Sequence, residues 1–440
     1  MDKNFYKKNK YKMNRARRDA ILSMLGENDR LVLDIGCGNG YLGGVIKEKR
    51  EIQVHGVDMS EDALEEASKK IDKTYFFDIS KNDWPEDILK NKYDKIILSE
   101  VLEHIFYPED ILEKIKNISH KNTEIIITVP NLLFWKNRLK IFFGNFEYKE
   151  KGLMDRGHIH FFSWKSFQDL IRQSGHHIVD KKHHIPTRGT KFLGKIFPGL
   201  FSYQFIVKIK KNNIAIYTAI FGGKDGLIEP KYIPKNCDFI CFTDADLKSK
   251  IWQVRKVEPD FEDPVRDARQ IKILPHKYLA DYKYSIWVDG NILVRSDINE
   301  LIDKYLKNKN IAIFDHNKLA KDPRDCVYKE AEALIKMSKT KKYKDDPELI
   351  KKQVEEYRGA GYPENNGLIS SMVILRRHNS EDVKKTMEDW WCELKNNSRR
   401  DQLSFNYVAW KNKLDFVYME GDSRDNKYFL HTPHKKKYYV

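Results

Sequence analysis

A glycine-rich turn directly after an apolar segment constrains the fold of this chain more than any other sequence feature. Residues 31–43 read LVLDIGCGNGYLG, and the run from Leu31 to Ile35 has the length and branching of a buried strand. A helical pattern follows the glycines, so the segment predicts a strand, a tight turn and a helix. The turn carries little side-chain bulk, which lets a ligand approach the backbone closely. A lone glycine triplet is a weak signal, so the neighbouring strands decide its meaning.

Three further strands are predicted in this half, and each ends in a polar side chain. The strand at 53–57 ends in Asp58, the strand at 74–77 ends in Asp78, and the strand at 94–98 ends in Ser99 and Glu100. Open α/β sheets bind ligands at the carboxyl edge of their strands. A carboxylate at the end of the second strand can accept both hydroxyls of a ribose. The first half is therefore predicted to be an α/β, Rossmann-like sheet.

The motif D-x-G-x-G-x-G stands here as Asp34, Gly36, Gly38 and Gly40. With the strand ends, it resembles the class I S-adenosylmethionine-dependent methyltransferases over roughly residues 15–211. A dinucleotide dehydrogenase would carry G-x-G-x-x-G without an acidic residue two positions before the first glycine. The resemblance implies a seven-stranded sheet, completed by a pair of strands near the end of this half.

The same resemblance implies a role for each polar strand end at the cofactor S-adenosylmethionine. Asp34 and the glycine loop would hold the methionine part of the cofactor. Asp58 would bind the ribose and Asp78 the adenine amino group, with Ser99 and Glu100 also at the cofactor.

The segment SEVLEHI follows the fourth predicted strand. On a helix, Glu100, Glu103 and His104 would lie at i, i+3 and i+4 and share a face. Further on, P-N, a basic and apolar helix and D-x-x-H-x-x-F-F resemble methyltransferases of glycan-assembly gene clusters. The matching residues are Pro130, Asn131, Asp155, His158, Phe161 and Phe162.

Three roles are open for these acidic and histidine side chains. Glu100, Glu103, His104 and either His158 or His160 could bind a hard divalent metal, as in small-RNA 2′-O-methyltransferases with a similar E-x-x-E-H pattern. Alternatively, His104 or His158 is the general base for a hydroxyl acceptor, because imidazole titrates near pH 7. In the third interpretation, the shared face only orders the loop over the cofactor.

Residues 132–147 and 191–204 interleave large apolar side chains with lysine and arginine. This pattern is typical of segments that rest on an anionic membrane face or grip a lipid-linked acceptor. It is also typical of a lid that packs on its own domain, and we favour the lid.

The polar segment 210–213 reads as a linker between two α/β bodies. We therefore predict a basic tail at 1–18, a methyltransferase domain at 19–211 and a second domain at 212–440. The second domain begins with a new apolar strand at Ile214.

In the second half, a strand predicted at 284–288 ends in Asp289-Gly290-Asn291. Sugar transferases of the GT-A fold use D-x-D at such a strand end to hold manganese or magnesium against the sugar diphosphate. Here the second position is Asn291, whose amide oxygen offers less charge to a metal. On its own, D-G-N is also a good turn.

The order of motifs in this half resembles retaining family-8-type glycosyltransferases. More closely, it resembles a GT-A-like glycosyltransferase family that includes plant Golgi proteins linked to mucilage and turgor. The shared marks are YTAIFGGKD, FTD, KILPHKYL, WVDGN, GYPENNGL and RRDQLSF.

This resemblance implies a nucleotide-sugar site at the strand ends. Donor-binding residues would be Thr218, Asp244, Arg269 and Gly367, with Arg269 and the late lysines neutralising phosphates. The expected divalent metal, manganese or magnesium, would be held by Asp289, Asn291 and His431, with His434 as a substitute.

Asp401 is the third candidate catalytic residue after His104 and His158, and it would face the donor sugar or the acceptor hydroxyl. It is also well placed to be a helix N-terminal charge paired with Arg399 or Arg400. The alternative for His431 and His434 is an exposed basic tail.

Taken together, the sequence predicts a bifunctional enzyme of surface polysaccharide biosynthesis, an O-methyltransferase fused to a glycosyltransferase. Its partners would be a nucleotide-sugar donor and a glycan or lipid-linked glycan acceptor. The alternatives are a nucleic-acid methyltransferase with an inactive binding domain, and a methyltransferase with a carbohydrate-binding module. No RNA-binding signature with interleaved aromatics accompanies the basic segments, which disfavours nucleic acid.

The net charge of +15 and the cysteines bear on location. Eight Lys or Arg and one Asp lie in residues 1–18, and Lys435, Lys436 and Lys437 lie near the other end. Basic ends attract phosphate groups, including those of anionic lipid. Five scattered cysteines, no secretory signal and no apolar run of 18 residues predict a cytoplasmic protein with peripheral contact at the inner membrane face.

Overall fold

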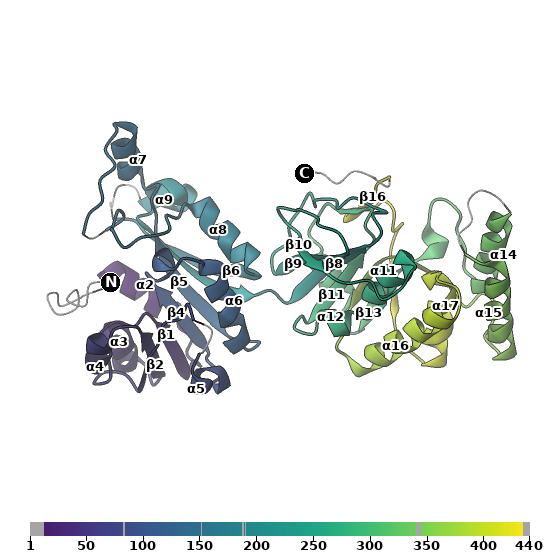
Figure 1. Ribbon diagram of the computed structural model, residues 1–440, viewed down its shortest axis with the longest axis horizontal. Helices are drawn as coiled ribbons and strands as arrows, with labels where there is room; N and C mark the ends of the chain where they lie inside the picture. The colour runs from purple at the N-terminus through teal and green to yellow at the C-terminus, as the bar shows by residue number, and fades with distance from the viewer. Residues whose placement is uncertain are drawn as a thin grey trace. The chain divides into compact units, whose positions relative to one another are not determined.

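The computed structural model describes residues 13–81, 84–150, 152–186, 189, 191–339 and 345–433, without the side chains of Lys191 and Lys195 (Figure 1). The chain divides into two compact units, Met1–Lys211 and Asn212–Val440. Each unit is built on its own seven-stranded sheet with helices packed on it. The predicted fold class, two α/β bodies in succession, is confirmed.

The first unit has a sheet with the strand order β3-β2-β1-β4-β5-β7-β6. Its strands are β1 Leu31–Ile35, β2 Gln53–Asp58, β3 Lys73–Phe76, β4 Lys95–Ser99, β5 Glu124–Pro130, β6 His176–His184 and β7 Gln204–Lys211. β1 to β5 run parallel, and β7 is antiparallel to both of its neighbours. The carboxyl ends of β1 to β5 therefore meet at one edge, where the predicted site residues lie.

Successive residues of the central strands bury themselves on opposite faces of this sheet. Ile96 and Leu98 belong to one apolar cluster, whereas Ile97 between them belongs to another. Side chains alternate across a strand, so a strand covered on both faces must be apolar at every position. This is why the central strands read as continuous apolar runs in the sequence.

In the chain, the helices of the first unit precede β1 or connect one strand to the next. They are α2 Arg15–Leu22, α3 Tyr41–Lys49, α4 Glu61–Ala67, α5 Glu86–Lys90, η1 Leu102–His104, α6 Pro108–Ile118, α7 Trp135–Phe142, α8 Trp164–Gln173, α9 Lys191–Ile196 and α10 Pro198–Phe201.

Two of these helices differ from the sequence interpretation. The last four residues of the basic segment 1–18 lie in α2, capped by the side chain of Asn14, and Arg17 among them is buried. The segment SEVLEHI is not an α-helix: η1 is a single 3-10 turn, and Glu100 before it has a φ of 61°. Glu100, Glu103 and His104 therefore do not share a helix face.

The second unit has a mixed sheet with the order β10-β9-β8-β11-β14-β13-β15. Its strands are β8 Ile214–Ile220, β9 Cys237–Thr243, β10 Gln253–Lys256, β11 Tyr284–Val288, β13 Ile311–Asp315, β14 Ile369–Arg376 and β15 Val417–Met419. β8 to β11 run parallel, whereas β14 is antiparallel to β11. A separate ribbon pairs β12 Ile292–Val294 with β16 Phe429–His431.

The helices of the second unit pack on this sheet and on one another. They are α11 Pro264–Ile273, α12 Pro275–Tyr278, α13 Asn299–Tyr305, η3 His316–Lys318, α14 Val327–Ser338, α15 Pro347–Gly359, α16 Glu381–Asn396 and α17 Asp401–Lys411. Trp390 and Trp391 of α16 are buried in its main apolar cluster, which confirms their prediction as core residues from helical spacing.

The five cysteines all lie in the described residues and none is in a disulfide. Cys37, Cys237, Cys241 and Cys326 are buried, and Cys392 on α16 is exposed. Burial raises the pKa of the Cys241 thiol to about 12 and that of Cys237 well above its ordinary value. Within the described ranges, no helix is both long and apolar enough to cross a membrane.

Candidate active sites

The glycine loop of the first unit is fixed by backbone hydrogen bonds and by Asp58. Gly36 and Cys37 donate their backbone N–H groups to the carbonyl of Val57 at 2.8 and 3.0 Å. Gly38 donates its backbone N–H to Oδ2 of Asp58 at 2.8 Å. Asp58, predicted to bind a ribose, thus also holds the loop in place.

The loop geometry requires glycine at its turning points. Gly36, Gly38 and Gly40 have φ values of 74°, 53° and 70°, a region that costs other residues about 1–2 kcal/mol. A Cβ on Gly36 would also lie 2.6 Å from Cγ2 of Val101. The turn is therefore closed to side chains, and its backbone stays accessible to a ligand.

Asp34, at the fourth position of β1, is the unusual charge in this site. Its side chain is buried, and its carboxylate makes no hydrogen bond to any residue that the structure describes. Burial, and then the charge of Asp58, raise the pKa of Asp34 to about 7. A buried carboxylate without a partner is costly unless a cation neutralises it. The site therefore suits a ligand with a positively charged amine.

Two further predicted residues lie at the same edge of the sheet. Asp78 follows β3, and its Oδ1 accepts hydrogen bonds from the backbone N–H and the hydroxyl of Ser80 at 2.9 and 2.7 Å. These hydrogen bonds lower the pKa of Asp78. Ser99 ends β4, and its hydroxyl lies 3.2 Å from that of Thr128 on β5. Both oxygen groups are ordered by neighbours at the strand ends.

Glu100 is held by a residue that the sequence interpretation assigned to a tail. Its Oε2 lies 2.9 Å from a guanidinium nitrogen of buried Arg17, and its own N–H donates to the carbonyl of Thr128. The carboxylate predicted to bind cofactor is therefore already ion-paired. The signal for Arg17 was its spacing from Ile21, since residues at i and i+4 share a helix face.

Glu103, His104 and His158 converge in the first unit. One oxygen or nitrogen from each side chain lies within 4.8 Å of the others. Glu103 is fully buried, and both of its carboxylate oxygens lack a hydrogen-bond partner among the described residues. Burial, reinforced by Glu100, raises the pKa of Glu103 well above its ordinary value. The cluster can therefore hold a shared proton or a cation.

The two histidines of this cluster are oriented through their Nδ1 atoms. Nδ1 of His104 lies 2.8 Å from the carbonyl of Gly157, and Nδ1 of His158 lies 3.4 Å from that of Leu153. A histidine that donates from Nδ1 has an unprotonated Nε2, ready to accept a proton or a metal. Burial and the neighbouring His104 lower the pKa of His158, which favours its neutral form.

The predicted metal set is therefore narrower than expected. His160 contacts the carbonyl of Phe106 through Nε2 at 2.9 Å, and Glu100 pairs with Arg17. Only Glu103, His104 and His158 of the predicted set come together.

In the second unit, the predicted donor residues come from four elements: Thr218 lies on β8, Asp244 directly follows β9, Arg269 lies on α11 and Gly367 just precedes β14. Oδ2 of Asp244, after β9, accepts the backbone N–H of Gly222 at 3.0 Å. Oδ1 of Asp244 and the hydroxyl of Thr218 on β8 are buried without a hydrogen-bond partner among the described residues. Gly367 precedes antiparallel β14 with a φ of 82°. Both oxygens are therefore buried acceptors without a donor in the described structure.

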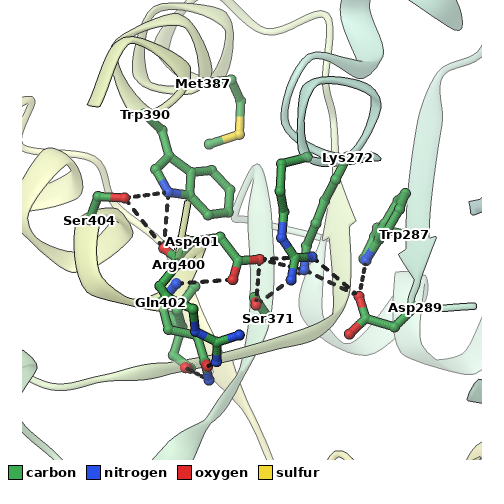
Figure 2. A network of polar contacts seen from close by, with 12 residues as sticks. Lys272, Trp287, Asp289, Ser371, Met387, Trp390, Arg400, Asp401, Gln402 and Ser404 are labelled. Carbon is green, nitrogen blue, oxygen red and sulfur yellow. Dashed lines mark hydrogen bonds and ion pairs between the residues drawn. The ribbon is translucent and has the colours of Figure 1, made fainter. Parts of the chain in front are cut away.

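Asp401 lies in a network of buried charges (Figure 2). Its Oδ2 lies 2.6 Å from Nζ of Lys272 and 3.2 Å from Arg269, and it accepts the hydroxyl of Ser371 at 2.8 Å. Lys272 and Asp401 are 0% and 1% exposed. Burial alone would raise the pKa of Asp401, but Arg269 and Lys272 hold it well below its usual range. The direct ion pairs of Asp401 are therefore with these two cations, and the charge of Arg400 also lowers its pKa.

The same two cations contact Asp289, which follows β11. Oδ1 of Asp289 accepts the indole N–H of Trp287 at 2.7 Å and lies 3.3 Å from Nζ of Lys272. Arg269 lies 3.8 Å from this oxygen. Two cations thus balance two carboxylates. The sequence interpretation missed Lys272, although its spacing of three from Arg269 puts both on one face of α11.

The predicted metal ligands come together only in part. The ribbon pairs Ile292 with His431, which brings Nε2 of His431 to 3.1 Å from Nδ2 of Asn291. Asp289 already contacts Arg269 and Lys272, and a divalent ion at this carboxylate would lie against both cations. These residues fit a divalent ion poorly. His434, Lys435, Lys436 and Lys437 lie outside the described residues.

Comparison with known proteins assigns each half separately. Residues 15–209 match the family model of the methionine biosynthesis protein MetW, and residues 242–429 match that of the TOD1/MUCI70 glycosyltransferase-like domain. The chain carries a methyltransferase-like domain followed by a glycosyltransferase-like domain. Both resemblances predicted from the sequence are confirmed.

Curated relatives agree with this assignment. The glycosyltransferase-like half is similar to the probable hexosyltransferase MUCI70 of Arabidopsis thaliana, with 26% identity over 225 residues, 44% of this chain and 37% of that protein. The methyltransferase-like half is similar to a ubiquinone biosynthesis O-methyltransferase of Glaesserella parasuis, with 34% identity over 107 residues, 23% of this chain and 45% of that protein. The chain thus spans less than half the length of either relative.

A solved structure is also similar to the methyltransferase-like half. It is an S-adenosylmethionine-dependent methyltransferase of Mesorhizobium loti, with 16% identity and a TM-score of 0.34, covering 44% of this chain and 96% of that one.

Proposed function

We propose that this chain is a bifunctional enzyme of surface glycan assembly. The first half would methylate a hydroxyl of a glycan with S-adenosylmethionine, and the second would transfer a sugar from a nucleotide-sugar. The observation that supports this most is that each sheet carries polar side chains without a hydrogen-bond partner among the described residues. Asp34 is the buried carboxylate in one sheet, and the hydroxyl of Thr218 and Oδ1 of Asp244 are the buried oxygens in the other. A carbohydrate-active relative on one side and an O-methyltransferase relative on the other suit a shared glycan acceptor.

In the methyltransferase-like half, the residues fit S-adenosylmethionine. When bound, this cofactor supplies an activated methyl group on a sulfonium. Asp34 would bind the cationic amine of its methionine part, and the backbone of the glycine loop would contact the same part. Asp58 would bind the ribose. Asp78 and Ser99 complete the edge, whereas Glu100 would act indirectly by holding Arg17.

The acceptor hydroxyl must lose a proton during methyl transfer, so a base is needed near it. We assign this role to Nε2 of His104 or His158, because both histidines are oriented through Nδ1. A divalent metal held by Glu103, His104 and His158 is the second candidate, favoured by the unpartnered carboxylate of Glu103. Methyl transfer that survives a chelator and is lost in His158→Gln would support the base, whereas loss with the chelator would support the metal.

In the glycosyltransferase-like half, a GT-A-like donor site would use the edge formed by Thr218, Asp244, Asp289 and Gly367. A leaving diphosphate needs positive charge, and Arg269 with Lys272 supplies it next to Asp289. Asp401 would keep these two cations in place rather than touch the sugar. A manganese or magnesium ion at Asp289, Asn291 and His431 would have to compete with them.

Nucleotide-sugar hydrolysis tests this half directly. Donors are screened with manganese and with a chelator, on the unmodified protein, Asp289→Ala and the matched control Asp246→Ala, whose side chain is 91% exposed. We expect hydrolysis that is lost in Asp289→Ala and retained in the control. No hydrolysis of any donor, with methyl transfer intact, would instead support a carbohydrate-binding module.

The proposal also places the enzyme in the cytoplasm, peripheral to the inner membrane face. Its cysteines, none of them bridged, suit a reducing compartment. The relatives of both halves give no support to the nucleic-acid alternative. A steep salt dependence of single-stranded RNA binding would be needed to revive it.

A further inference from the structure

Helix α7 buries none of its residues, contrary to the lid that we expected to pack on its own domain. Figure 1 shows α7 at the tip of a segment that extends away from the sheet. Phe142 and Phe143 at its end are 80% and 73% exposed. Soluble proteins rarely leave several large apolar side chains together in water without a binding role.

The exposed apolar side chains continue beyond α7. We call the α7 surface the set formed by Leu139, Ile141, Phe142, Phe143, Phe146 and Tyr148, all of which are exposed. Arg138 donates to the carbonyl of Gly199 on α10 at 3.4 Å, and α10 packs against α9. Phe192 on α9 is 72% exposed, and Phe197 between α9 and α10 is exposed as well.

Positive charge is interleaved with these apolar groups. α7 itself carries Lys136, Arg138 and Lys140 and no acidic residue. A cavity of about 490 Å³ lies beside the helix, and Lys136, Lys140 and Lys149 line it. Glu147 is the one acidic residue among the described residues of its lining. Three ammonium groups around one cavity favour an anionic occupant.

We propose that the α7 surface docks on an anionic phospholipid bilayer, with lipid phosphate drawn to the cavity lined by Lys136, Lys140 and Lys149. Aromatic and aliphatic side chains enter the headgroup boundary, and lysines beside them reach the phosphates. A second copy of the chain is a poor occupant, because a symmetric dimer would place each surface, with its cations, against itself. This docking would bring the enzyme to a lipid-linked acceptor, and that purpose rests on the proposed function.

The location of the surface suits that purpose. α7 begins five residues after β5 ends at Pro130, and β5 ends at the same edge as the candidate methyl-transfer site. The acceptor side of the methyltransferase-like half would therefore face the lipid.

Vesicle flotation of the full chain tests the docking without any substrate. The probes are vesicles of phosphatidylcholine alone and vesicles that also contain phosphatidylglycerol. The variants are Phe142→Ser with Phe143→Ser, and Lys136→Glu with Lys140→Glu. The matched control is Leu89→Ser with Lys92→Glu, both exposed on and beside α5.

We expect the unmodified protein and the control to float with the anionic vesicles, and each α7 variant to lose about tenfold or more of that binding. Binding to phosphatidylcholine alone should be weaker, and salt should reduce the anionic binding. No flotation of the unmodified protein, or undiminished flotation of both α7 variants, would overturn the inference. So would a dimer in solution that the phenylalanine variant dissociates.

A soluble glycan acceptor separates this inference from the proposed function. Methyl transfer to it should persist in the α7 variants if only docking depends on them. Flotation of a protein that shows no methyl transfer would support the docking surface and contradict the proposed methyltransferase activity.

Discussion

At the scale of single residues, Asp34 stores an unfavourable charge that a ligand can relieve. Its pKa is about 7 in the folded protein because of burial and Asp58, against about 4 in an unfolded chain. Between these values the folded state binds more protons than the unfolded one, so this group lowers stability as pH rises from 4 to 7.

The substitution Asp34→Asn should therefore stabilise the unliganded protein. We expect its free energy of unfolding to exceed that of the unmodified protein by ~1 kcal/mol or more at pH 8, with a smaller difference at pH 5. Affinity for S-adenosylmethionine should fall in the same variant. Denaturant unfolding and calorimetric titration measure both effects. Glu66→Gln, which removes an exposed charge, serves as the control, and equal behaviour of the two variants would contradict the role of Asp34.

Asp401 presents the opposite case, because removal of its charge leaves Arg269 and Lys272 with Asp289 as their shared carboxylate and one positive charge uncompensated. Loss of one partner of a buried ion pair typically costs about 3–5 kcal/mol. We expect Asp401→Asn to destabilise the second unit by about that amount, and the added change Lys272→Met to restore part of it. Denaturant unfolding measures both variants. A stable Asp401→Asn protein that has lost only donor turnover would instead place Asp401 at the sugar.

At the scale of elements, the glycine loop combines backbone strain with steric closure. Gly36 has a φ of 74° and no room for a Cβ, whereas Gly144 has a φ of 79° and no atom within 4 Å of its Cβ position. Both alanine variants pay for positive φ, so their difference isolates the clash with Val101. We expect Gly36→Ala to lose at least ~1 kcal/mol more stability than Gly144→Ala. Equal losses in denaturant unfolding would mean that the loop relaxes around the new methyl group.

The strands were predictable because they are buried on both faces, which leaves a run of apolar residues in the sequence. Leu31–Ile35 and Tyr284–Val288 were expected within a residue of their observed bounds. The segment after β4 was not predictable in this way. Its i, i+3, i+4 spacing suggested a helix, but the positive φ of Glu100 and its ion pair with Arg17 turn the chain into a single 3-10 turn.

The partners of the site carboxylates depend on packing rather than on local pattern. Arg17 reaches Glu100 across 83 positions of sequence, and Lys272 reaches Asp401 across 129. Each cation had a helical spacing that marked its face, but nothing in the sequence indicated which acid it would meet. The sequence therefore predicted which edges carry the candidate sites and not how their charges are balanced.

At the scale of the whole molecule, the two units should unfold separately. Each has its own sheet and apolar clusters. We expect two calorimetric transitions. S-adenosylmethionine should stabilise only the first unit, raising its free energy of unfolding by about 2.7 kcal/mol at a concentration one hundred times the dissociation constant. The substitution Asp401→Asn should lower the transition temperature of the second unit only. A single transition that moves with both changes would show that the units unfold together.

The distribution of thiols gives the molecule one natural position for chemical attachment. Four of the five cysteines are buried, and only Cys392 on α16 is exposed. A maleimide dye added to the folded, unmodified chain should therefore couple at Cys392 ahead of the other four thiols. The label would sit in the glycosyltransferase-like half alone. Its fluorescence could then follow events in that half while the other half works unlabelled.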